Sequence, residues 1–133
     1  MPQLAHTSIP DLQSADSGRI ALTFFFQLMG HWQCSTEQQR NLLGSIGAST
    51  YFNWKKLPGT RLPHDTLERI SYLMGIHKAL RILFSTQPER AYEWVHKPND
   101  AAPFNGRSAL QYMLAGRVVD LADTRRYLDG VRG

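Results

Sequence analysis

The sequence contains a single cysteine, Cys34, among its 133 residues. One cysteine cannot form an internal disulfide bond, which is typical of a protein from a reducing compartment. Long hydrophobic runs are also missing, because the most apolar stretch, residues 20–29, is far too short to cross a bilayer. The first residues, 1–17, have neither the basic nor the apolar region of a signal peptide. These absences predict a soluble, cytoplasmic protein without a membrane partner.

Sequence motifs of catalysis are missing as well. The histidines at positions 6, 31, 64, 77 and 96 have no spacing that places two on one helical face with a cysteine or carboxylate. A glycine-rich phosphate loop and a nucleophile elbow are both absent. Glu89 and Glu93 lie one helical turn apart, but the nearby Arg90 and Lys97 favour a solvated face over a carboxylate pair. The sequence therefore predicts no enzyme activity, no catalytic residue, no metal and no cofactor.

Charge is only modestly unbalanced, with 15 lysines and arginines against 11 acidic residues and a formal net charge of +4. Such an excess favours an anionic partner, but it is also common in proteins that bind nothing charged. Hydrophobic residues make up 42% of the chain, which is enough to bury a core in one domain or in two very small ones. Composition thus predicts a folded chain and gives only weak support to nucleic-acid binding.

No stretch alternates apolar and polar residues as a strand does. Apolar residues recur instead at helical spacing, and serine, proline and glycine mark the expected helix ends. The expected helices are residues 19–32, 37–43, 48–57, 63–85, 88–96, 108–115 and 117–130, of which the fourth is one long helix or two that meet at Gly75. We predict an all-α fold with a flexible segment 1–17, a helix-turn-helix part 18–75 and a small helical part 76–133 packed against it.

The segment LGSIGASTYFNWKK, residues 43–56, has a glycine-containing turn between two short helices. This order is typical of a helix-turn-helix, whose second helix enters the major groove of DNA. Ile46, Tyr51, Trp54 and Leu57 form the expected buried stripe and leave a polar, basic face outward. An amide such as that of Asn53 suits base edges, and lysines suit phosphates. The candidate DNA-binding residues are Ser49, Thr50, Phe52, Asn53, Lys55, Lys56 and Arg61.

The same spacing also fits a helical hairpin in a bundle whose exposed polar residues bind nothing. Phe52 is compatible with both interpretations, because an exposed ring can contact a thymine methyl group and a buried one can pack against another helix. Spacing alone leaves the two interpretations open.

Residues 64–133 contain several motifs in one order: LERI, GIHKALRILF, ERAYEWVHKPN, FNGRSALQYMLAG and RRYLDGVRG. Together they resemble the toxin-binding domain of Xre/MbcA/ParS-type antitoxins. The upstream LLGSIGASTYFNWKKLPGTRL is similar to the Xre-like DNA-binding half of such proteins. The resemblance implies a type II antitoxin that silences a RES-domain toxin, which is an NAD-consuming enzyme, and that binds the promoter DNA of its own operon to repress it.

Two departures from the family pattern are visible. Ala109 follows Gly-Arg-Ser where the family usually has proline, and alanine can occupy the first turn of a helix at little cost. The turn GSIGAS is one residue longer than usual, and Gly47 replaces the serine expected as helix cap. This second departure leaves the register of the groove-facing residues open by about one position.

The expected toxin-binding surface follows from the resemblance and from the chemistry of the toxin. A pocket that holds the pyrophosphate of NAD should be cationic and open, so the end of helix 117–130 can enter it and offer its carboxylate. The alternative is a tail that frays in solvent. The candidate toxin-binding residues are Asn105, Gly106, Arg107, Arg125, Arg126, Tyr127, Leu128, Val131, Arg132 and Gly133.

One helix-turn-helix contacts few base pairs, so a homodimer that binds two half-sites is expected, with residues 67–84 as its candidate interface. With the toxin it would form a higher-order complex. Two other functions stay open: a stand-alone transcription regulator in which residues 76–133 only dimerise, and an interaction adaptor whose helix-turn-helix does not bind DNA.

Overall fold

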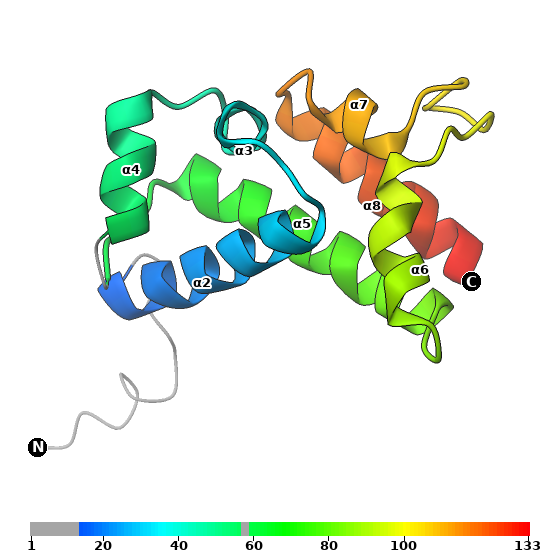
Figure 1. The fold of residues 1–133 in the computed structure, drawn as a ribbon, viewed down its shortest axis with the longest axis horizontal. Helices are drawn as coiled ribbons and strands as arrows, with labels where there is room; N and C mark the ends of the chain where they lie inside the picture. Colours follow the sequence, from blue (N-terminus) through cyan, green and yellow to red (C-terminus); the bar gives the residue numbers. More distant parts are fainter. Residues whose placement is uncertain (1–13, 57–58) are drawn as a thin grey trace, which may run out of the picture.

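The computed structural model describes residues 14–56 and 59–133. In these ranges the chain is helical, and its only strand-like pairing is an isolated bridge between Pro98 and Ser108 (Figure 1). The predicted all-α fold is therefore confirmed. The elements are α2 (Ala15–His31), α3 (Thr36–Leu42), α4 (Ala48–Lys56), α5 (His64–Leu83), α6 (Pro88–Glu93), the 3-10 helix η1 (Trp94–His96), α7 (Ala109–Met113) and α8 (Val118–Arg132).

Serine side chains define the starts of three helices. At α2, the Ser14 hydroxyl accepts a hydrogen bond of 3.1 Å from the backbone N–H of Ser17. Ser35 and Ser108 each form a capping box with the glutamine three residues later, at α3 and α7. A capping box satisfies two backbone donors that the first turn of a helix leaves unpaired. Because Ser35 is the cap, α3 begins one residue earlier than expected, at Thr36.

The central element is α5, a single helix of 20 residues that runs without interruption past Gly75. Figure 1 shows α2, α3 and α4 gathered around one part of α5, and α6, α7 and α8 around the other. Glycine at position 75 permits a close approach rather than a joint, since a Cβ there would lie 2.5 Å from Nε of Arg125 on α8. Of the two arrangements that the sequence allows, one long helix is correct.

One cluster of buried apolar side chains extends through both parts of the molecule. Phe25, Trp32 and Tyr51 belong to it on one side, and Phe104 and Leu128 on the other, all at most 1% exposed. Each such side chain contributes about 1.5–3 kcal/mol through removal from water. The division of the chain between residues 75 and 76 stays a prediction. Within the two described ranges, no helix combines the length and apolarity needed to span a membrane.

Candidate functional site

The turn between α3 and α4 contains two successive residues in the left-handed region, Gly44 with φ of 101° and Ser45 with φ of 60°. Glycine adopts this conformation without a Cβ clash, and its predicted place at the end of α3 is confirmed. The Ser45 N–H donates to the Arg40 carbonyl at 2.8 Å, and Arg40 Nε donates to the Ile46 carbonyl at 2.9 Å. The backbone of the turn is therefore fixed to the last turn of α3.

Helix α4 packs onto the core through the predicted stripe. Tyr51 is 0% exposed, and its hydroxyl donates a 2.6 Å hydrogen bond to Oε1 of Gln39 on α3. Its ring meets Phe26 on α2 edge to face, with centroids 5.8 Å apart. Trp54 and Ile46 are partly buried against the same core. The inward stripe is thus confirmed for these residues, while Leu57, its fourth expected member, lies outside the described residues.

The opposite face of α4 is exposed. Phe52 is 47% exposed, so of its two alternatives the solvent-facing one is correct. Lys55 Nζ lies 5.4 Å from the ring centroid of Phe26, and this cation–π contact holds the charge over that ring. The side chains of Asn53 and Lys56 make no hydrogen bond or ion pair with the described part of the chain. All seven candidate DNA-binding residues are exposed: Ser49, Thr50, Phe52, Asn53, Lys55, Lys56 and Arg61.

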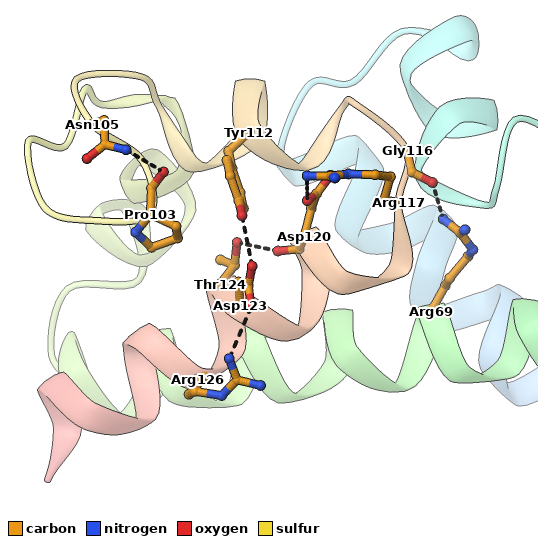
Figure 2. A network of polar contacts seen from close by, with 10 residues as sticks. All are labelled: Arg69, Pro103, Asn105, Tyr112, Gly116, Arg117, Asp120, Asp123, Thr124 and Arg126. Atoms are coloured by element: carbon orange, nitrogen blue, oxygen red, sulfur yellow. Dashed lines mark hydrogen bonds and ion pairs between the residues drawn. The ribbon is translucent and has the colours of Figure 1, made fainter.

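The second candidate surface begins with the loop between η1 and α7, which closes on itself. The Asn99 N–H donates to the Arg107 carbonyl at 3.1 Å, and the Gly106 N–H donates back to the Asn99 carbonyl at 2.8 Å. Asn105 and Gly106 have left-handed backbone conformations, with φ of 53° and 95°. Figure 2 shows the Asn105 amide turned toward the Pro103 carbonyl, to which it donates at 3.3 Å. The three predicted residues 105–107 are exposed on an ordered projection.

An aromatic cluster joins this loop to α8. Phe104, 0% exposed, meets Tyr127 of α8 edge to face at 5.2 Å and Trp94 of η1 at 6.0 Å. Such edge-to-face pairs add stabilisation beyond the area they bury. The cluster brings Tyr127 and this loop, which the sequence predicts together, to one end of the fold. Trp94 and Phe104 were not among the candidates, although both lie in the family-like motifs ERAYEWVHKPN and FNGRSALQYMLAG.

A polar network links α7 to α8 beside that cluster (Figure 2). The Tyr112 hydroxyl donates to Oδ2 of Asp123 at 2.8 Å, and Arg126 Nη1 donates to Oδ1 of the same carboxylate at 3.0 Å. The Arg107 guanidinium lies 5.2 Å from the Tyr112 ring centroid. Burial raises the pKa of Tyr112, and the hydrogen bond to Asp123 raises it further. The phenol is therefore a protonated, permanent donor near neutral pH.

The end of α8 differs from the predicted free basic tail. The helix continues to Arg132, two residues beyond its expected end. Leu128 is 1% exposed and packs in the core, so it cannot contact a partner. Arg125 and Arg132 both lie 3.6 Å from Asp129, which offsets part of the positive charge. The other candidates of α8 stay partly or fully exposed: Arg125, Arg126, Tyr127, Val131, Arg132 and Gly133.

The part of the chain that the structure describes is expected to hold neither a metal site nor a reactive cysteine. In these residues no three histidine, cysteine, aspartate or glutamate side chains are close enough to hold a metal ion. Burial raises the pKa of Cys34 to about 11. Near neutral pH its sulfur is therefore a thiol, whereas nucleophilic attack requires a thiolate.

Both surfaces fall in segments that match known domains. The sequence model of the antitoxin Xre-like helix-turn-helix domain matches residues 11–75. That of the antitoxin Xre/MbcA/ParS C-terminal toxin-binding domain matches residues 79–133. The chain is also 52% identical over 122 residues to the uncharacterized protein y4oB of Sinorhizobium fredii. The aligned residues make up 90% of this chain and 92% of that protein. Helix α4 lies in the first matched segment, and the loop and α8 lie in the second.

Proposed function

The chain belongs to the Xre/MbcA/ParS family of type II antitoxins, and we propose that its toxin is a RES-domain enzyme that consumes NAD. We also propose that the protein represses its own operon through the helix-turn-helix. The match of residues 79–133 to a toxin-binding domain is the observation that supports the first proposal most. The exposed, polar face of α4 supports the second.

Neutralisation needs only steric cover of the toxin's active site, without any reaction. The projection at residues 105–107 is ordered by its own hydrogen bonds, and the aromatic cluster holds it beside α8. An ordered surface loses little conformational entropy on binding, so most contact energy remains available for affinity. Val131, 54% exposed, is the apolar contact at the end of α8. The helical end of α8 thus replaces the extended tail as the covering element.

Repression assigns separate tasks to side chains of α4. Asn53 can form paired hydrogen bonds with an adenine edge, which gives sequence specificity. Lys56 contacts phosphate, which contributes affinity but no specificity. Lys55, held over the Phe26 ring, is placed to contact phosphate with little loss of side-chain freedom.

A homodimer would place two copies of α4 on half-sites roughly 34 Å apart, one turn of the double helix. The structure has an apolar groove suited to this pairing. Ile20 on α2 and Met74 on α5 are 57% and 40% exposed, and both line a hollow of 320 Å³ with Leu67 and Ile70. This groove includes part of the predicted interface, residues 67–84, and adds α2 to it.

Co-expression with a RES-domain protein encoded beside this chain tests the assignment. We expect the two proteins to co-purify, and we expect the antitoxin alone to bind its promoter with strong salt dependence. Promoter binding without any toxin complex would favour a stand-alone regulator. Toxin binding without promoter binding would restrict the helix-turn-helix to a structural role.

A further inference from the structure

Arg69 on α5 is a buried charged group at a point where three segments of the chain meet. Its side chain is 10% exposed. Nε donates to Oδ2 of Asp65 at 2.9 Å, and Nη1 donates to the carbonyl oxygen of Gly116 at 2.8 Å, 47 residues away. Figure 2 shows the guanidinium directed at that carbonyl. Burial of a charge is costly unless it is paired, so both bonds constrain where the arginine can lie.

The turn before α4 lies against the same guanidinium. A Cβ on Gly44 would stand 3.1 Å from Nε of Arg69 and 3.2 Å from the Asp65 carboxylate. On the other side, a Cβ on Gly116 would stand 3.4 Å from the hydroxyl of Ser45. The helix-turn-helix turn, α5 and the loop before α8 are thus close together, with Gly44 beside the side chains of Arg69 and Asp65 and Gly116 beside the Ser45 hydroxyl.

The Gly116 loop is itself fixed to α8. Arg117 donates to both carboxylate oxygens of Asp120, at 2.8 Å and 3.3 Å. Asp120 is 0% exposed in the first turn of α8, where a negative charge is favoured by the helix dipole. A continuous series of contacts therefore runs from α8 through the Gly116 carbonyl and Arg69 to the turn at Gly44, and from there to α4.

We propose that Arg69 is a positioning residue for α4, and that through it the loop at Gly116 in the toxin-binding half sets the orientation in which α4 meets DNA. The inference rests on the proposed binding of promoter DNA. It makes the toxin-binding half a structural part of the DNA-binding unit, although none of its residues touches DNA.

Arg69→Met and Arg69→Lys test this proposal in the full-length protein. Methionine removes both hydrogen bonds, and lysine retains the charge without the planar fork that reaches two acceptors in different directions. Arg81→Met is the matched control, because Arg81 is an exposed arginine of the same helix. Promoter affinity and the ratio of promoter to random-sequence affinity are measured at a temperature at which circular dichroism shows every variant folded.

We expect both Arg69 variants to lose promoter affinity by about three- to thirty-fold, and Arg81→Met to lose none. Toxin affinity should change little, because neither side-chain hydrogen bond of Arg69 involves residues 105–107 or the end of α8. Folded Arg69 variants with wild-type promoter affinity and specificity would overturn the proposal. If the wild-type protein bound no promoter, the proposed repression would fail instead, and the positioning role would be decided by amide hydrogen exchange.

Exchange at Ser45 and Ile46 reports the turn without DNA, because both amides donate to the Arg40 carbonyl. We expect faster exchange there in Arg69→Met than in Arg81→Met. Asp65→Asn provides a second variant if Arg69→Met does not fold, since it weakens the same contact and leaves the bond to Gly116 in place. Unchanged exchange in both variants would exclude a positioning role.

Discussion

Tyr51 on α4 donates a 2.6 Å hydrogen bond to the side-chain oxygen of Gln39 on α3, and both residues are buried. The Gln39 amide donates in turn to the Cys34 carbonyl at 3.0 Å, which fixes its orientation. A buried network in which every member is satisfied has one favourable arrangement. This pair therefore determines which face of α4 points inward, and so which residues face a DNA groove.

Tyr51→Phe should destabilise the fold by about 1–3 kcal/mol, because the Gln39 oxygen then loses a buried donor. Tyr72→Phe is the matched control, a partly buried tyrosine with no hydroxyl hydrogen bond to the described residues. The measurement is the free energy of unfolding in urea. Equal stabilities of the two variants would show that the bond contributes nothing.

Asn53→Ala should weaken promoter binding by about 1–3 kcal/mol and leave binding to random DNA nearly unchanged. Lys56→Gln should weaken both alike and lower the slope of log affinity against log salt by about one. Titrations at several salt concentrations distinguish the two. If Asn53→Ala reduced both affinities equally, Asn53 would not contact a base.

Val131→Lys should lower toxin affinity by about five- to thirty-fold, because it replaces an apolar contact beside a cationic pocket by a positive charge. Phe52→Ser is the control, since it changes an exposed apolar residue on the other surface. Phe52→Ser should weaken promoter binding, whereas the Val131 variant should leave it unchanged. A point substitution is preferable to removal of residues 127–133, because that deletion would also remove the buried Leu128. Full toxin affinity in Val131→Lys would exclude the end of α8 from the interface.

Ile20→Asp and Met74→Asp should convert the proposed homodimer into monomers at micromolar concentration, because each places a charge in the apolar groove between α2 and α5. Ile82→Asp changes an equally exposed residue of α5 that does not line the groove. Sedimentation velocity measures the oligomeric state of the three variants. Dissociation by Ile82→Asp alone would place the interface at the other end of α5.

Stability should depend on pH through His77. Burial lowers its pKa below the ordinary value of 6.5, and the charges of Arg81 and His31 lower it further. The unfolded chain therefore binds a proton at this site more readily than the folded one. The contribution of neutral His77 is fully present above pH 6.5 and is lost as the pH falls toward the lowered pKa.

His77→Gln should flatten the fall in unfolding free energy below pH 6.5. Urea unfolding between pH 5 and pH 8 measures the slope. Equal slopes in the wild type and His77→Gln would assign the pH dependence to other groups.

Local features of the fold could be predicted from the sequence because their causes are local. Ser35 as a cap and Gly44 as a left-handed residue follow from the chemistry of a single helix end. Leu128 lies seven residues after Leu121 on the same helical face, so its burial can also be predicted from the sequence. Its expected role as a toxin contact conflicts with that spacing.

Other features depend on contacts between distant segments, and no periodicity indicates them. The bond from Arg69 to Gly116 spans 47 residues, and helical spacing does not indicate it. For the same reason, the spacing of apolar residues does not decide between one continuous helix and two helices that meet at Gly75. The close packing of the Arg125 side chain against α5 explains why residue 75 is glycine.

The most direct test of the account is the NAD consumption of the purified RES-domain toxin as the full-length protein is added. We predict that activity falls to the background level near a fixed molar ratio for the wild type, and that Val131→Lys requires a higher concentration. Full NAD consumption in the presence of excess folded wild-type protein would contradict the central claim that residues 79–133 cover the active site of such a toxin.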